Sequence, residues 1–426
     1  MLCDGKYNES TAVGTEVAEE DLGSMFVWIP RFSYKITKGY HQNSGELNVQ
    51  WVSGKSYSYV DETGELKKAK NGNDEGVITT SGYTDYVVHP AFTDGSSNEY
   101  SNGEWRQEIT GIWVAKFQAG IYTTDKDTNK RVAEVNNYYY PVFKGRKYGY
   151  NYVTVSEAYK LSLGLSNKEN PYGLTATSNS HLMKNSEWGA AAYLSISQYG
   201  YSNGSSNNEK YKNNLSIVSY NNIGTSPVSN PNNSGWKIIG ITGYSARSGK
   251  AAENVMTFTS TTDFTDSVTG TNGTSYAWNN VETGKDVGNG TKSSTTGNIY
   301  GIYDMGGCLA DYLSAYVNAE GVSSLATHGG AFANGKSTYL ATAYPYNPTT
   351  TDYKDFNSAY PGFSKIFGDA IYEVSSNVGG ANAWFGQILE NDAGTGEVFF
   401  PRGGPWNATG GVGLVRLVWR CWACNF

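Results

Sequence analysis

Apolar residues in this chain come in short runs, and this feature most limits how the chain folds. Residues 25–30 and 110–117 are two such runs, and the stretches around them are rich in Asn, Ser, Gly and Tyr. Charged residues make up 17% of the chain and aromatic residues 14%, so amide and hydroxyl groups must supply much of the polar surface. This composition favours turns and short strands over long helices. We therefore predict a loop-rich chain of the α+β class, with short strands and few helices.

The predicted organisation is one domain after a short lead-in. Residues 1–24 are polar and acidic and form the lead-in, and residues 25–426 form the domain. Turn dipeptides mark residues 37–110 as an insertion of loops and short hairpins. Residues 199–298 are dominated by Asn, Ser, Gly and Thr. We expect an ordered insertion there, because long structureless segments are uncommon inside compact domains.

One helix is predicted at residues 155–163. Ser156 lies at its start, Ala158 and Leu161 share one face, and Gly164 follows as a stop signal. This pattern predicts a half-buried helix.

A second helix is predicted at residues 185–197, with Asn185 or Ser186 as its cap. Trp188 and Leu194 belong to a set of apolar residues at roughly helical spacing. This helix, too, is expected to be half-buried.

The charge balance and hydropathy exclude two classes of partner. The net charge of −7 argues against nucleic acid, because phosphate binding needs clustered Lys and Arg. No window approaches the roughly 20 apolar residues that span a bilayer, so we expect no membrane span in this chain. The start at Met1 resembles a fragment joined to a start codon. We expect an export signal or anchor to lie outside it.

The cysteines are too few and too scattered for a disulfide framework. They are Cys3, Cys308, Cys421 and Cys424. The last two have the spacing of a redox or zinc pair, but zinc needs further ligands and a redox pair needs a helix that follows a strand. The sequence shows neither context, so no such site is predicted.

Several motifs follow one another along the chain: the strand ending Trp28-Ile29-Pro30, the strand at 111–117, the helix opening Val155-Ser156-Glu157-Ala158, Leu182 with Glu187-Trp188, Tyr300-Gly301-Ile302-Tyr303-Asp304-Met305, and Arg402-Gly403-Gly404-Pro405-Trp406. In this order they resemble the formylglycine-generating-enzyme branch of the C-type lectin fold. The resemblance covers residue 25 to the end and implies a C-type lectin fold within the α+β class.

The oxidase members of this family hold copper through cysteines that follow the Gly-Gly pair. This chain has Ala408 and Gly413 at those positions, while Cys421 and Cys424 come later. Because Cu(I) needs soft sulfur ligands, we expect no copper and no enzymatic activity. The alternative is a copper oxidase of the formylglycine-generating type that uses the two later cysteines in shifted positions.

The composition changes abruptly at Pro405, after which the chain has no Lys, Asp, Glu, Ser or Tyr. This break is similar to the diversified segment in variable proteins of diversity-generating retroelements, which share the fold. Error-prone copying at adenines varies Asn-type codons there, and such codons cannot encode Lys, Glu, Gln, Met or Trp. Apart from Trp406, Trp419 and Trp422, every residue of 405–426 belongs to the reachable set.

The resemblance implies a non-enzymatic display protein whose variable surface binds varied macromolecular targets. Trp406 and Asn407 would help to anchor the scaffold. The predicted ligand-binding residues are Pro405, Ala408, Thr409, Gly410, Leu414, Val415, Arg416, Leu417, Val418, Trp419, Arg420, Cys421, Trp422, Ala423, Cys424, Asn425 and Phe426.

A structural calcium site is the cofactor that the resemblance implies. Asp304 and Asp311 occupy the carboxylate positions of calcium-binding relatives, and Gly307 and Leu309 offer backbone carbonyls. Calcium prefers such hard oxygen ligands. The alternative is that Asp304 caps a short helix at Met305 and that Asp311 is solvated.

The expected partner is a protein or other macromolecule on another cell or particle, bound outside the cell, at a cell surface or on a phage particle. The remaining alternative is a fixed phage-tail or pilus adhesin whose C-terminal segment does not vary.

Overall fold

The computed structural model describes a set of segments spread along the whole chain: residues 10–17, 22–38, 46–79, 82–95, 104–121, 134–135, 138–139, 141–145, 150, 155–166, 174–200, 242–246, 267–270, 273–277, 294–296, 298–305, 311–318, 340–345, 367–370, 373 and 399–402.

The strands in these segments are short. They are β1 (Phe26–Pro30), β2 (Phe32–Lys38), β3 (Glu46–Trp51), β4 (Ser58–Val60), β5 (Leu66–Lys68), β6 (Ile78–Thr79), β7 (Gly82–Tyr83), β8 (Val87–Val88), β9 (Gly111–Ala115), β10 (Gly120–Ile121), β11 (Glu134–Val135), β12 (Tyr138–Tyr139), β13 (Pro141–Val142), β14 (Tyr244–Ala246), β15 (Ser267–Gly270), β16 (Gly273–Ala277), β17 (Asp311–Asn318), β18 (Thr342–Pro345) and β19 (Phe399–Arg402). The helices are α1 (Val155–Gly164), α2 (Asn185–Ile196) and the 3-10 turns η2 (Pro90–Phe92) and η3 (Ala176–Ser178).

The strands form several small sheets rather than one large one. β1 pairs with β9, and β2 lies between β3 and β8, all in antiparallel fashion. β17 pairs in parallel with β18 and antiparallel with β19. Short strands, small sheets and few helices confirm the prediction of a loop-rich α+β fold.

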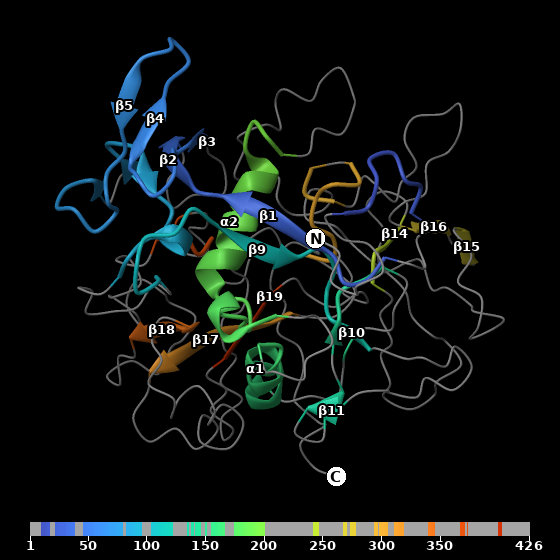
Figure 1. Cartoon of the computed structure of the whole chain (residues 1–426). Helices are drawn as coiled ribbons and strands as arrows, with labels where there is room; N and C mark the ends of the chain where they lie inside the picture. The colour runs from blue at the N-terminus through green and yellow to red at the C-terminus, as the bar shows by residue number, and fades with distance from the viewer. Residues whose placement is uncertain are drawn as a thin grey trace.

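Helix α2 runs through the middle of the molecule, with β1 and β9 crossing it on one side (Figure 1). Every residue of α2 except Leu194 is buried, so the prediction of a half-buried helix is wrong. Small side chains explain the difference. Gly189 and the alanines at 190–192 let neighbouring elements approach the helix from several sides, and α2 contacts η2, β3 and β17.

The start of α2 also differs from the prediction. Its N-cap is Lys184, not Asn185 or Ser186, which lie buried in the first turn. The Glu187 carboxylate accepts a hydrogen bond from the backbone N–H of Lys184 at 2.9 Å, the reciprocal half of a capping box. The Asn185 side chain is used elsewhere, as an acceptor for Arg402.

Helix α1 matches its prediction within one residue. Val155, Tyr159 and Leu161 are buried on its inner face. Ala158 is half-buried. The pattern of apolar residues therefore gave the right element and nearly the right face.

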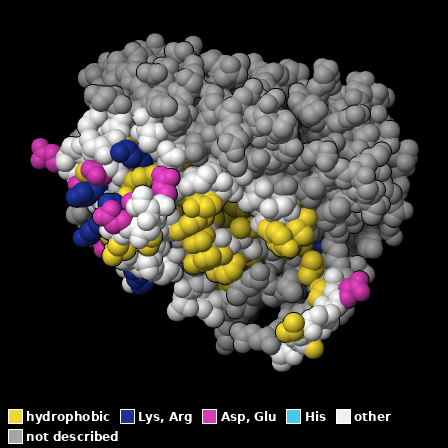
Figure 2. All heavy atoms as spheres, turned by 90° about the horizontal axis from the view of Figure 1, so that it is seen from above, with side chains coloured by type: hydrophobic (Ala, Val, Ile, Leu, Met, Phe, Trp, Pro, Cys, Tyr) yellow, Lys and Arg dark blue, Asp and Glu magenta, His cyan; other side chains and the backbone are white. Residues whose placement is uncertain are grey.

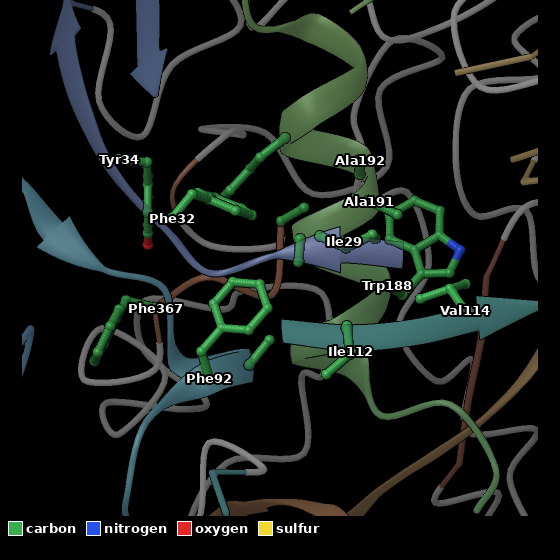
Figure 3. Packing of buried hydrophobic residues seen from close by; sticks show 14 of the residues in the cluster. Ile29, Phe32, Tyr34, Phe92, Ile112, Val114, Trp188, Ala191, Ala192 and Phe367 are labelled. Carbon is green, nitrogen blue, oxygen red and sulfur yellow. The ribbon is translucent and has the colours of Figure 1, made fainter. Parts of the chain in front are cut away.

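The main core forms where α2 meets the first strands and η2. Figure 3 shows Trp188 beside Val114, and Phe32 and Tyr34 from β2 on the other side of the cluster. Phe32 and Phe92 are fully buried, with ring centroids 5.3 Å apart. Burial of large aromatic side chains is the main favourable term available to a chain with so little regular structure.

A buried polar network completes this core. The Glu373 carboxyl group accepts hydrogen bonds from the hydroxyls of Tyr34 at 2.8 Å and Tyr193 at 2.5 Å, and from the backbone N–H of Gly368. Desolvation raises the pKa of Glu373 to about 8 despite these donors. The network joins β2 to α2 and to residues 367–370.

The close approach at Gly189 gives a direct test of the packing. A Cβ at this position would lie 2.0 Å from the carbonyl oxygen of Gly368. We predict that Gly189→Ala lowers the free energy of unfolding by about 1–3 kcal/mol through overpacking, although Ala is normally the better helix former by about 1 kcal/mol. Thermal or urea unfolding measures the change.

The matched control is Lys160→Ala on the exposed face of α1, expected to lie within about 0.5 kcal/mol of the wild type. A Gly189→Ala protein more stable than the wild type would contradict the packing described for α2.

Candidate functional site

The predicted binding surface at residues 405–426 lies outside the described residues. So do Gly307, Leu309 and all of the cysteines considered above. The structure does describe the strand that leads into the predicted surface, β19, and the two aspartates of the predicted metal site. These are the parts from which a site can be built.

Arg402, the last residue of β19, is anchored in the core. Its side chain is 1% exposed, and its guanidinium lies 3.9 Å from the centroid of the Trp188 ring. It donates hydrogen bonds to Asn185 Oδ1 at 3.1 Å and to the carbonyl oxygen of Ala370 at 3.2 Å. A planar guanidinium can stack and donate at the same time, which an ammonium group cannot do as well.

The backbone of β19 is held as well. It pairs with β17 in an antiparallel register in which Arg402 lies opposite Asp311, and Phe399 lies opposite Tyr316. Arg402 of the Arg-Gly-Gly motif and Asp311 of the predicted metal site are thus neighbours across one sheet.

Asp304 is buried and has a left-handed backbone conformation, with φ of 60°. Both of its carboxylate oxygens accept a hydrogen bond from the backbone N–H of Gly243, at 3.0 and 2.9 Å. The backbone N–H of Gln118 also points to Oδ2, at 3.4 Å. Residues 301–305 form no helix, and residues 306–310, where a helix capped by Asp304 would continue, lie outside the described residues. The carboxylate ties together two distant loops.

Asp311 lies at the start of β17 and accepts a hydrogen bond from Gln118 Nε2 at 2.5 Å. Gln118 therefore links the two aspartates, one through its backbone and the other through its side chain. Desolvation, with a further contribution from the charge of Asp304, raises the pKa of Asp311 to about 8. Asp311 is half-buried and hydrogen-bonded to Gln118, so it is only partly solvated.

The two aspartates provide hard oxygen ligands of the type that calcium prefers. They do not make a complete cation site by themselves, because calcium takes roughly six to eight oxygens. Among the described residues there is no group of three or more His, Cys, Asp or Glu side chains arranged to hold a metal ion.

A cavity of about 680 Å³ lies against β9, and we call it the β9 groove. All five residues of β9 line it, together with parts of α1, residues 178–183, 302–305 and 311–313. Asp304 and Asp311 lie in its wall near Gln118, and Glu187 and His181 lie in another part of the wall. Pockets of this size with a few polar groups are the usual form of a ligand site.

An ion-pair cluster borders this groove. Of its members, the sequence analysis named only Glu187, as part of a motif. Glu187 Oε2 lies 3.0 Å from His181 Nε2, and Glu187 Oε1 lies 3.4 Å from Lys184 Nζ. Lys184 Nζ also lies 3.9 Å from the centroid of the Trp105 ring. Burial acts to raise the pKa of Glu187, but the charges of His181 and Lys184 outweigh it and hold the pKa at about 2.

The cluster is internally compensated, because each charge has an opposite partner and Glu187 also caps α2. We assign it a role in fixing the start of α2. The Glu187-Trp188 dipeptide was the one sequence signal for it, and its partners come from outside that motif.

No protein-family model matches this sequence, and no curated protein matches it. Among the described residues, no helix combines the length and the apolar character needed to cross a membrane.

Asp311 gives a prediction for pH dependence. Its pKa is raised from 3.8 to about 8, so the folded state holds this proton more tightly than the unfolded state does. The contribution of Asp311 to the free energy of unfolding is therefore fully present below about pH 4. It decreases as the pH rises toward 8, by at most about 1.4 kcal/mol per pH unit. Asp311→Asn should remove this part of the slope, as measured by urea unfolding across that range.

Glu373 titrates in the same range, so part of this slope should persist in Asp311→Asn and be reduced further in the double variant with Glu373→Gln. Burial lowers the pKa of His89 to about 3, and its opposite contribution should remain in every variant. The control is Asp85→Asn at an exposed position, which should leave the slope unchanged. An Asp311→Asn protein with the wild-type slope would contradict the assignment.

Proposed function

We propose that this protein is a non-enzymatic ligand-binding protein of C-type lectin fold, whose C-terminal segment is diversified by a retroelement and presented for binding. The observation that carries the proposal is the anchoring of Arg402. The residue just before Gly403-Gly404 is fixed to the most buried helix, so the segment that follows starts from a rigid base.

A rigid base matters because a variable surface must change its side chains without unfolding the protein. Arg402 contacts Trp188, Asn185 and Ala370, none of which belongs to residues 405–426. These three contacts are therefore the same whatever side chains the segment carries. Preorganisation of this kind also limits the entropy lost when a ligand binds.

The composition of residues 405–426 supports the same proposal. Its residues, apart from three tryptophans, belong to the set that Asn-type codons reach, and it contains Trp and Arg side chains of the type that dominates binding hot spots. The partner we propose is a protein or other macromolecule on another cell or particle. The site of action would be outside the cell, at a cell surface or on a phage particle.

The alternative function, a copper oxidase, requires that Cys421 and Cys424 bind Cu(I) together. Titration with Cu(I) and a thiol probe separates the two functions. Tight binding that is lost in Cys421→Ser would favour the oxidase. A fixed adhesin would be distinguished by an invariant segment in sibling genes.

We also propose calcium as a structural cofactor at Asp304 and Asp311. The observation in its favour is that two linked carboxylates share one region, and that the charge of Asp304 helps to raise the pKa of Asp311. A bound divalent cation would reverse this effect, because it stabilises the ionised form. CaCl₂ at neutral pH should therefore raise the melting temperature of the wild type but not of Asp311→Asn. An equal rise in both would overturn the proposal.

The display function predicts opposite outcomes for the anchor and the segment. Arg402→Lys should lower the free energy of unfolding by about 2–4 kcal/mol, because it leaves buried acceptors and the stacking face of Trp188 poorly matched. Val415→Asn and Leu417→Asn, which stay within the reachable set, should each change it by less than about 0.5 kcal/mol. Urea unfolding of the full chain measures all three.

Losses of about 2–5 kcal/mol for Val415→Asn or Leu417→Asn would identify the segment as a core strand and would contradict the display function.

A further inference from the structure

Strand β9 has one paired edge and one open edge. It pairs with β1 in a register that places Trp28 opposite Trp113. The hydrogen bonds that flank this pair run from the Lys116 N–H to the Met25 carbonyl and from the Arg31 N–H to the Thr110 carbonyl. Hydrogen-bonded and non-hydrogen-bonded pairs alternate in an antiparallel ladder. The backbone N–H and C=O groups of Ile112 and Val114 therefore point toward β1. Gly111, Trp113 and Ala115 direct their backbone groups away from it.

The outward backbone groups of β9 have no partner within the described part of the chain. β1 and β9 form a two-stranded sheet, and no hydrogen bond from Gly111, Trp113 or Ala115 to another element is present. Unpaired N–H and C=O groups on a strand edge are a template for pairing with another strand.

The open edge faces the β9 groove. All five residues of β9 line this groove, whereas β1 contributes only Phe26 and Trp28. Ala158, Leu161 and Leu165 line another part of the groove wall, and β9 lies between β1 and α1 in Figure 1. The groove is thus bordered by an unsatisfied backbone edge and by apolar side chains.

An exposed aromatic pair lies on one face of this two-stranded sheet, with Trp28 on β1 and Trp113 on β9. Trp28 is 39% exposed and Trp113 is 53% exposed, and their ring centroids lie 5.1 Å apart. Gly111 makes room for them, since a Cβ there would lie 2.4 Å from the Trp28 ring. Figure 2 shows hydrophobic side chains gathered near the middle of one face, with most of the charged side chains to the left. Exposed apolar surface of this kind marks interaction sites.

The Asp304 and Asp311 carboxyl groups favour a basic group at one end of the groove, because the negative charge of Asp304 acts on Asp311. Gln118, three residues after β9, donates to Asp311, and no Lys or Arg forms an ion pair with Asp311 among the described residues. At the other end, Glu187 is already neutralised by Lys184 and His181. The acidic end therefore lies beside the C-terminal end of β9.

We propose that the β9 groove binds an extended peptide, which adds as a third, antiparallel strand to the open edge of β9 and places a basic side chain beside Asp311. The antiparallel direction follows from the greater stability of antiparallel pairing, and it puts the basic residue at the N-terminal end of the peptide. This mode of recognition uses main-chain hydrogen bonds for affinity and alternate side chains for specificity. The site is separate from residues 405–426 and does not depend on the function proposed for them. It shares Asp311 with the proposed calcium site, so the peptide's basic group and Ca²⁺ would compete there, and binding is measured without calcium.

The test uses the full chain and the peptide acetyl-Lys-Val-Thr-Val-Thr-Val-amide, with binding measured by calorimetry. Two analogues carry N-methyl groups, one on the valines and the other on the threonines. In an added strand only alternate N–H groups face β9, so one analogue should lose affinity by about fivefold or more for each hydrogen bond removed. The other analogue should bind like the parent peptide.

Two proline variants provide the matched pair on the protein. Ala115→Pro removes an outward N–H, so it should abolish peptide binding and leave the melting temperature nearly unchanged, since proline is tolerated on a strand edge. Val114→Pro removes an N–H that pairs with β1, so it should lower the melting temperature. Asp311→Asn should weaken binding of the parent peptide but not of an analogue in which alanine replaces the peptide's lysine.

Three results would overturn the proposal. One is no binding of the parent peptide up to millimolar concentration. Another is equal affinity for both N-methylated analogues, which would indicate contact through side chains alone. The third is strong protection from hydrogen exchange at Trp113 and Ala115 in the free protein, which would show that the chain itself already pairs with this edge.

Discussion

The stacking of Arg402 on Trp188 is the contact on which the rest of this structure depends. Trp188 is fully buried in α2, and α2 is the element around which the first strands, η2 and β17 are packed. Through Arg402 the last described strand joins the same core. A charged group is costly to bury unless its donors and its ring face are matched, so this contact fixes the position of β19 as well as adding stability.

The sequence predicted the elements better than their environments. The apolar runs at 25–30 and 110–117 predicted β1 and β9, and helical spacing predicted both helices. The full burial of α2 was not predicted, because it depends on Gly189 meeting Gly368 from a distant loop. Likewise, the sequence predicts Asn185 as a helix cap, yet its side chain accepts a hydrogen bond from Arg402. Such contacts are determined by tertiary packing, and the local propensities of the residues carry no information about it.

In the candidate sites, too, the sequence indicated individual residues but not the contacts between them. Asp304 and Asp311 were singled out by their motif, and the structure brings them together through Gln118, which no motif indicated. The open edge of β9 was not predicted either, because strand pairing cannot be read from a single strand. A core built around α2 thus leaves two candidate binding regions: the base of the C-terminal segment, and the β9 groove, whose wall contains Asp304 and Asp311.

The central claim, that residues 405–426 are diversified on a fixed scaffold, is tested most directly by sequencing the DNA that flanks the gene. The account predicts a second, nearby copy of the segment from about Gly403 onward that differs from the gene only at adenines. Flanking DNA without such a copy, or a copy that differs equally at all four bases, would contradict it.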